Sequence, residues 1–308
     1  MRRFRPSSQP NTLRDKVTSI ISDSRFSSPA GSGTDLRPAA VMGMDEDSRV
    51  ALARIEALAA TRKIGVPGRF MPDAGVSARL AALGVAEQVE EADFFKYRLI
   101  ALPYCGIEPR LRRSWEEAGY TIEDLTSPQV RRAQVALGLL KMEGAQGLVI
   151  GCHDHPETIA ISGGNSAVKV IEDTTDTSRL LFSPAFGAVC QTTLSPRKVS
   201  WLVQQLRLRW KDARVTFLDT VSPAMAAREE ALERLLVDCD RVVVVGETGE
   251  SSCEALAEVA LRRGKSAVIA ATPGALAAAD FRPGGKIALS AGAFATDEAI
   301  RAVAESLC

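Results

Sequence analysis

The sequence predicts an α/β fold in which three similar units each contain a small parallel sheet. From about residue 46 onward, short apolar runs alternate with amphipathic helical segments, a pattern typical of parallel sheets covered by helices. The alternation falls into three stretches of about 80 to 90 residues, a common size for a small domain. We therefore expect domains at 46–126, 127–217 and 218–308, preceded by a tail at 1–45.

The expected elements follow from the spacing of apolar residues. The first helical pattern is "EDSRVALARIEALAATRK" (46–63), and the Pro- and Gly-containing stretch "IGVPGRFMPDAG" (64–75) ends it. Apolar runs predict strands at 97–102, 120–125, 147–151, 167–172, 186–191, 214–219, 241–246, 266–271 and 286–291. Amphipathic spacing predicts helices at 108–118, 128–143, 196–211, 224–238, 252–263 and 296–307. Ligands of open parallel sheets bind outside the carboxyl ends of the strands, so residues directly after strands are the first site candidates.

Composition excludes several classes of partner. Lys plus Arg and Asp plus Glu both number 38, so no net field favours nucleic acid or an anionic membrane surface. No stretch of about 18 apolar residues occurs that could span a bilayer. The six cysteines are scattered without a CxxC pair, which favours the reducing cytoplasm over a disulfide framework. We expect a small-molecule ligand, with no nucleic-acid or membrane partner.

The N-terminal stretch 1–45 is rich in Arg, Ser, Pro and Gly and has no periodic apolar face. This composition predicts a disordered tail. An organelle transit peptide is a weaker alternative, because Asp15, Asp23 and Asp35 interrupt the basic pattern.

Both histidines of the chain lie in "GCHDHPET" (151–158), which follows a predicted strand. Three interpretations are open to it: metal ligation by Cys152, His153 and Asp154, a helix cap or surface turn without function, or acid–base chemistry or anion binding. Zinc normally needs three or four ligands, and no second ligand cluster occurs elsewhere in the sequence. Histidine titrates near neutrality and a pocket can raise the pKa of a glutamate. We favour an acid–base turn built on His155 and Glu157, with His153 peripheral.

Two further strand ends carry hydroxyl groups. In "VCQTTLSPRK", capping accounts for Ser195 before Pro196, whereas Thr192 lies where a ligand contact is expected. In "RVVVVGETGESSCEAL", the free amides at the start of the helix favour an anion. The spacing matches neither a P-loop nor a complete dinucleotide motif. An N-cap at Ser251 or Ser252 explains the pattern about as well, and Glu250 would repel a phosphate.

Five segments together resemble the 4-hydroxy-3-methylbut-2-enyl diphosphate reductase family, known as IspH or LytB. They are "GCHDHPETIAISGG", "CQTTLS", "DTVSPAMAAREEAL", "VVVVGETGESSCEAL" and "LSAGAFATDEAI", in the order and spacing of that family over about residues 68–308. The resemblance implies three pseudo-equivalent α/β domains around a central cavity. There, three cysteines, one per domain, hold an iron–sulfur cluster that reductively removes a hydroxyl from an allylic diphosphate.

The resemblance also assigns roles to individual residues. The family's HPE motif implies a diphosphate contact for His155 and proton delivery for Glu157, and its QTTLS motif makes Thr192 the pocket threonine. By the same resemblance, six further residues are expected to bind substrate: Gln191, Thr193, Ser251, Ser252, Cys105 and Arg228.

The family's cluster ligands are absent from this sequence. The three cysteine positions match Asp73, Ser127 and Ser222, and a serine hydroxyl stays protonated at neutral pH and is a poor iron ligand. The family's diphosphate-binding serines fall on Glu250 and Phe294, and a pocket histidine falls on Cys105. We therefore expect no standard cluster, no metal site and a poor fit for a diphosphate.

Three hypotheses follow. The first is an altered enzyme that uses Glu157 and His155 for acid–base chemistry, with Thr192 orienting a small molecule. The second keeps redox chemistry with a relocated [4Fe-4S] cluster held by thiols expected near the cavity, namely Cys105, Cys152, Cys190 and Cys253; buried cysteines acting as small hydrophobes are the ordinary alternative. The third is a non-catalytic paralogue that binds a metabolite or a partner.

Overall fold

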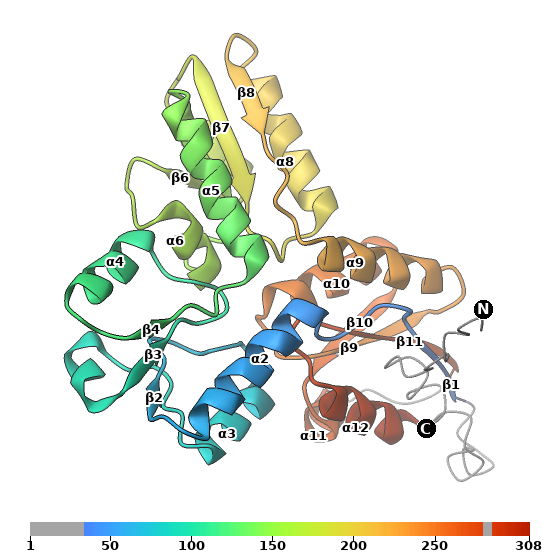
Figure 1. Ribbon diagram of the computed structural model, residues 1–308. Helices are drawn as coiled ribbons and strands as arrows, with labels where there is room; N and C mark the ends of the chain where they lie inside the picture. The colour runs from blue at the N-terminus through green and yellow to red at the C-terminus, as the bar shows by residue number, and fades with distance from the viewer. Residues whose placement is uncertain (1–33, 280–284) are drawn as a thin grey trace, which may run out of the picture.

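The computed structural model describes residues 34–279 and 285–308, and within them three parallel sheets form three lobes. The first lobe has the sheet order β2-β3-β4, the second β6-β5-β7-β8 and the third β1-β11-β9-β10. Figure 1 shows the second lobe above the other two, with the third lobe at lower right. The predicted α/β fold with three parallel sheets is confirmed.

The first lobe contains a short sheet and the helices that cover it. Its strands are β2 (Ile64–Gly65), β3 (Leu99–Ala101) and β4 (Ile122–Glu123). Its helices are α2 (Glu46–Ala59), α3 (Ala74–Ala82), the 3₁₀ helix η1 (Glu91–Lys96) and α4 (Pro109–Glu117). The stretch expected to be irregular, 64–75, contains β2 at its start and the first residues of α3 at its end. Asp73 caps α3 by accepting from the Val76 amide at 2.9 Å.

The second lobe has the longest helices packed on its sheet. Its strands are β5 (Gln146–Ile150), β6 (Lys169–Ile171), β7 (Ala185–Cys190) and β8 (Arg214–Phe217). Its helices are α5 (Pro128–Met142), α6 (Pro156–Ser162), α7 (Thr174–Arg179) and α8 (Pro196–Arg209). The short helices α6 and α7 are too brief to give a clear amphipathic period in the sequence.

The third lobe combines C-terminal elements with one N-terminal strand. Its strands are β1 (Thr34–Pro38), β9 (Arg241–Val245), β10 (Ser266–Ala270) and β11 (Gly285–Ala291). Its helices are α9 (Pro223–Leu235), α10 (Ser251–Arg262), α11 (Pro273–Ala278) and α12 (Asp297–Leu307).

Proline defines the start of many of these helices. Its fixed φ suits the first helical turn, and the amide it lacks would have no intrahelical partner there. In the described part of the chain, six helices begin with proline, at Pro109, Pro128, Pro156, Pro196, Pro223 and Pro273. Each of these prolines places the preceding residue in the N-cap position, which becomes important at the site.

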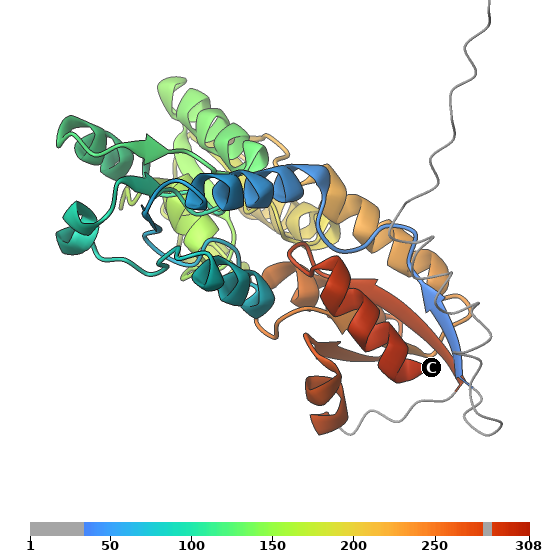
Figure 2. The same cartoon turned by 60° about the horizontal axis from the view of Figure 1, so that its bottom comes forward.

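The predicted tail is wrong for residues 34–45. Strand β1 pairs in parallel with β11, from Thr34 opposite Gly285 to Pro38 opposite Leu289 (Figure 2). Leu36 is buried in the third lobe's core, and Asp45 caps α2. The pattern "TDLRP" is that of an edge strand with one buried residue, so it lacks the apolar run that identifies central strands. Residues 1–33 lie outside the described residues.

The lobes share apolar cores, which fixes their relative positions. One cluster of buried side chains runs from Ile150 and Cys190 in the second lobe to Met225 and Leu256 in the third. Another cluster in the first lobe includes contacts with Phe294 from the third. Across the described ranges, no helix has both the length and the apolar character that crossing a membrane requires.

Because β1 pairs with β11, we expect residues 34–38, which the sequence analysis assigns to a disordered tail, to stabilise the fold. We expect Leu36→Ala to lower the free energy of unfolding by about 2 to 4 kcal/mol, because it opens a cavity in the core of the third lobe. The control Val41→Ala, in the same segment but 40% exposed, should change it by less than about 0.5 kcal/mol. Equal effects in urea melts would contradict the placement of β1.

Candidate functional site

A cavity of about 540 Å³ lies where the three lobes meet, a size typical of small-molecule sites. Each lobe contributes side chains to its wall. The residues that the argument uses are Asp45, Arg69, Phe70, Tyr104, Cys105, Ser127, His155, Glu157, Thr192, Thr193, Ser222, Met225, Arg228 and Phe294. Most of the wall is apolar, so the few polar groups that face the cavity determine what can bind.

The topology brings two predicted strand-end motifs together. Strands β5 and β7 are parallel neighbours, and Ile150 at the end of β5 pairs with Cys190 at the end of β7. The turns that follow carry Glu157 and Thr192, so both lie at the same carboxyl edge of the sheet. This placement follows from the parallel register alone.

Glu157 is a buried acid with its carboxyl group in the cavity wall. Its side chain is 3% exposed, and Oε1 accepts a short hydrogen bond from the Thr192 amide. Burial raises the pKa of Glu157 to about 7, the hydrogen bond from Thr192 opposes the rise, and the negative charge of Glu250 adds to it. The carboxyl group is therefore divided between its acid and carboxylate forms near neutral pH.

His155 caps α6 and also lines the cavity. Its Nδ1 accepts from the Glu157 amide at 3.2 Å, which assigns the ring proton to Nε2. Burial lowers the pKa of His155 to about 4, so the ring is neutral at pH 7. His153 instead lies half-exposed with Nε2 2.9 Å from Asp176, and it is absent from the cavity wall.

The buried side chain of Gln191 forms hydrogen bonds with the segments after β5, β7 and β9. Its Oε1 accepts from the Cys152 amide at 3.1 Å and from the Thr158 hydroxyl at 3.2 Å. Its Nε2 donates to Thr193 Oγ1 and Ser251 Oγ, each at 2.8 Å. Both atoms of the side-chain amide thus have partners in the protein, and Gln191 is not among the residues that line the cavity. The expected substrate contact of Gln191 stays a prediction. Thr193 does line the cavity.

The expected substrate contacts at Ser251 and Ser252 also stay predictions, and both serines have partners within the protein. The N-cap of α10 is Glu250, whose carboxylate accepts from the Ser252 and Cys253 amides at 3.0 Å each. The Ser252 hydroxyl donates to Glu250 and accepts from the Ala293 amide at 2.7 Å. Neither serine lines the cavity, because internal hydrogen bonds hold both.

Arg228 lies in the wall as the largest fully buried side chain. Its Nε and Nη2 donate to the Gly43 carbonyl at 3.0 and 2.6 Å, and Nη2 lies 3.8 Å from the Asp45 carboxylate. Burial lowers the pKa of Arg228. The Arg228 guanidinium thus binds the segment after β1. Gly43 lies 185 residues away in the chain, so the sequence alone could not predict this contact.

Aromatic rings form another part of the wall that the motifs did not identify. Tyr104 and Phe294 meet edge to face with ring centroids 5.9 Å apart. Cys105 follows Tyr104, and burial raises the pKa of its thiol to about 12, so the group is uncharged. Tyr104 comes two residues after a predicted strand, which is the signal that could have pointed to it.

The three positions where the family resemblance places cysteines are all helix N-caps. Asp73 caps α3 and Ser127 caps α5, whereas Ser222 occupies the N-cap position of α9 without a side-chain cap hydrogen bond. Ser127 Oγ accepts from the Gln129 amide at 3.2 Å. Ser127 and Ser222 line the cavity, and Asp73 is buried directly after the lining residue Pro72.

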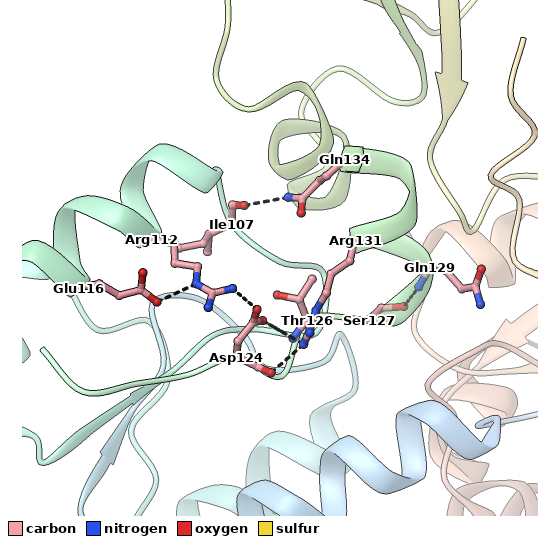
Figure 3. Close-up of polar contacts among 9 residues, drawn as sticks. All are labelled: Ile107, Arg112, Glu116, Asp124, Thr126, Ser127, Gln129, Arg131 and Gln134. Atoms are coloured by element: carbon pink, nitrogen blue, oxygen red, sulfur yellow. Dashed lines mark hydrogen bonds and ion pairs between the residues drawn. The ribbon is translucent and has the colours of Figure 1, made fainter. Parts of the chain in front are cut away.

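The loop before Ser127 is held in place by Asp124, as Figure 3 shows. The Asp124 carboxylate accepts from the Thr126 amide at 3.0 Å and from the Arg112 guanidinium, and Arg131 lies 3.3 Å away. These contacts join α4, the end of β4 and the start of α5. They hold the Ser127 hydroxyl at the wall of the cavity.

The donor set of this chain does not fit an iron–sulfur cluster. Such clusters need several thiolates in one place. Within residues 34–279 and 285–308, no three His, Cys, Asp or Glu side chains gather in a group that could hold a metal ion. Of the four cysteines considered for a relocated cluster, only Cys105 lines the cavity. Cys190 contacts Thr220 at 3.4 Å, and Cys253 lies against glycine backbone of the third lobe. A relocated cluster stays an untested hypothesis.

Three parallel-sheet lobes around a cavity whose wall includes a buried glutamate define a class of three-lobed α/β proteins. A family model described as LytB protein matches residues 48–308. The chain belongs to the LytB protein family, which confirms the resemblance.

Relatives and solved structures agree with this assignment. A 4-hydroxy-3-methylbut-2-enyl diphosphate reductase of Rhodopirellula baltica is 27% identical over 205 residues, 66% of this chain and 64% of the relative. One of Saccharophagus degradans is 28% identical over 209 residues, 66% of this chain and 67% of the relative. The match thus spans somewhat less than two thirds of the length of the first relative.

The fold comparison covers more of the chain. The structure of the E-1-hydroxy-2-methyl-but-2-enyl-4-diphosphate reductase from Plasmodium falciparum superposes with a TM-score of 0.82 at 22% identity, covering 87% of this chain and 86% of that one. A second solved structure, of (E)-4-hydroxy-3-methyl-but-2-enyl diphosphate reductase, gives a TM-score of 0.62 at 22% identity, covering 89% and 99%. These similarities establish the three-lobed fold.

The raised pKa of Glu157 predicts a pH-dependent cost to folding. Below pH 4.5 the Glu157 carboxyl group is protonated in the folded and in the unfolded protein. Between pH 4.5 and 7 it ionises only in the unfolded protein, so the free energy of unfolding falls as pH rises. Above pH 7 the loss is complete, at about 3 kcal/mol. We expect Glu157→Gln to be more stable than the wild type by about that amount at pH 8 and about equal at pH 4.5.

Chemical denaturation at several pH values would measure this difference. The control Glu230→Gln, an exposed carboxylate paired with Arg234, should show no such trend. A stability difference for Glu157→Gln that stays constant with pH would contradict the raised pKa.

Proposed function

We propose that this chain binds a small molecule in the cavity between its lobes and exchanges a proton with it through Glu157, without an iron–sulfur cluster. The observation that carries the proposal is the buried carboxyl group in the wall of the cavity, with its pKa near neutrality. Perturbed acids in clefts are typical of general acid–base catalysts, whose pKa is best placed near the working pH.

The surrounding residues support this chemistry. In its acid form, Glu157 breaks its O–H bond and gives the proton to a basic atom of the ligand. The Thr192 amide then stabilises the carboxylate, which regains a proton from another position of the ligand or from water. His155 offers its neutral Nε2–H as a hydrogen-bond donor, and the Thr192 hydroxyl orients the ligand.

The relatives named above are reductases of an allylic diphosphate, whereas this proposal contains no reductive step. The reason is the donor set: Asp73, Ser127 and Ser222 stand where the family resemblance places thiolates, and each occupies a helix N-cap. What this chain shares with the family in the proposal is the cavity, the acid and the threonine beside it.

A metabolite-binding protein without turnover is the second candidate. It is favoured by the partners that His155 Nδ1 and Glu157 Oε1 already have within the protein. The two candidates differ in a single measurable property, the transfer of protons to the ligand.

Proton exchange can be tested on ligands found by a thermal-shift screen of small metabolites. Each binder is incubated with the protein in D₂O, and loss of carbon-bound hydrogen signals is followed by proton NMR. We expect Glu157→Gln to slow exchange by about 100-fold or more with binding retained, because it removes the proton donor. The wild-type rate should fall as pH rises through about 7.

The exposed Glu230→Gln variant serves as the matched control and should exchange at the wild-type rate. Unchanged exchange in Glu157→Gln would remove Glu157 from the mechanism. Binders that show no exchange at all would support the metabolite-binding candidate instead.

Cluster content can be tested on protein purified and reconstituted with iron and sulfide under anaerobic conditions. We expect a colourless protein with less than about 0.1 iron per chain, because the sites of the three thiolates hold oxygen ligands. The triple variant Asp73→Cys, Ser127→Cys, Ser222→Cys should gain iron in the same protocol. Stoichiometric iron and sulfide in the wild type would contradict the proposal.

A further inference from the structure

At several helix starts near the cavity, side chains of the protein already bind the first amides, whereas Glu108 of α4 and Ser222 of α9 form no such cap. Free N–H groups at a helix N-terminus are the usual binding groups for phosphate. Here Asp73 accepts from the Val76 amide, His155 from the Glu157 amide, and Glu250 from two amides of α10. Side chains of the protein thus occupy positions that a phosphate would need, and two of them are carboxyl groups.

The two arginine side chains in the cavity wall, Arg69 and Arg228, already bind groups of the protein. The Arg69 guanidinium forms two contacts with the Glu247 carboxylate, at 2.9 and 3.0 Å. Arg228 donates to the Gly43 carbonyl and lies near Asp45. His155 is neutral at pH 7 because burial lowers its pKa to about 4. In the described wall, each guanidinium therefore has a partner in the protein.

Glu250 places a negative charge behind this wall. Its side chain is buried, and its Oε2 would lie 2.8 Å from a Cβ added at Gly292, the residue before the lining pair Ala293 and Phe294. Asp45 and Glu108 line the cavity as well. An incoming diphosphate, which carries several negative charges, would meet carboxylates without gaining a free cation.

The remaining residues of the cavity wall are mostly apolar. Phe70, Tyr104, Met225 and Phe294 line the cavity, and the Tyr104 and Phe294 rings pack edge to face. Hydroxyl groups of Thr192 and Ser222 and the acid form of Glu157 provide a few hydrogen bonds. Such a combination of apolar surface and isolated polar groups is typical of sites for neutral ligands.

We propose that the cavity binds an uncharged molecule with an apolar carbon chain and a single hydroxyl or carbonyl oxygen, and that Glu250 excludes the corresponding diphosphate. The inference names the ligand class for the proposed function and rests on it for the location of the site. It differs from the activity in the names of the relatives, whose substrate is a diphosphate.

A matched pair of probes tests the ligand class. Calorimetry compares geraniol with geranyl diphosphate, which share one hydrocarbon chain, and inorganic pyrophosphate tests the anion alone. We expect geraniol to bind at least about tenfold more tightly than its diphosphate, and pyrophosphate not to bind. Tighter binding of the diphosphate would overturn the proposal, and so would a failure of geraniol to bind.

Variants at position 250 test the role of the carboxylate. Glu250→Gln keeps an oxygen that can accept from the α10 amides but removes the charge, and Glu250→Ser also makes room. We expect both to bind geranyl diphosphate about tenfold more tightly than the wild type, with geraniol affinity unchanged. The control Glu258→Gln removes an exposed carboxylate from the same helix and should change neither affinity. Equal diphosphate affinity in wild type and Glu250→Gln would remove Glu250 as the determinant.

The two proposals fail in different ways. Wild-type protein that binds geraniol but exchanges no proton with any binder contradicts the proposed function alone. Proton exchange on a tightly bound diphosphate contradicts the ligand class alone.

Discussion

The hydrogen bond from the Thr192 amide to the Glu157 carboxyl group is the contact on which the chemistry of the cavity depends. It joins the turns after β5 and β7, whose parallel register places their ends side by side. The Thr192 carbonyl accepts from the Ser222 amide at 2.9 Å, at the start of α9 in the third lobe. Thr192 therefore binds Glu157 through its backbone N–H and the third lobe through its backbone C=O. The position of the Glu157 carboxyl group and the shape of the cavity are coupled for this reason.

The residues at the positions where the family resemblance implies cysteines are suited to the starts of helices. Each position begins a helix, and aspartate and serine are among the best N-cap residues. Asp73 and Ser127 accept from the amides of their own helices, and Asp124 holds the loop before Ser127 through contacts with two arginines. The ends of α3 and α5 are thus stabilised locally. Local capping can organise the cavity wall where the family resemblance implies a cluster.

The sequence predicts the elements well where a periodic apolar pattern is long, and poorly where a partner is distant. Alternating patterns identified most strands and the strand-end residues Glu157 and Thr192. They missed β1, since an edge strand needs only Leu36 to be buried, and they missed the Gly43 carbonyl that holds Arg228. A serine cap of α10 is one of the two interpretations that the sequence leaves open, and in the structure the N-cap is Glu250, directly after Gly249 with φ of 84°. Tertiary context decides such cases.

A buried carboxyl group without a cation is a cost that a purely structural core would avoid. Burial raises the pKa of Glu157, and the charge of Glu250 adds to the effect. The buried Arg228 of the same cavity wall binds Gly43 and lies near Asp45 instead. Replacing Glu157 by an apolar side chain would remove that cost, since the shared core of the second and third lobes does not depend on its charge. The arrangement makes physical sense if the acid form is used: the same surroundings that disfavour the carboxylate make its proton available to a neutral ligand near pH 7.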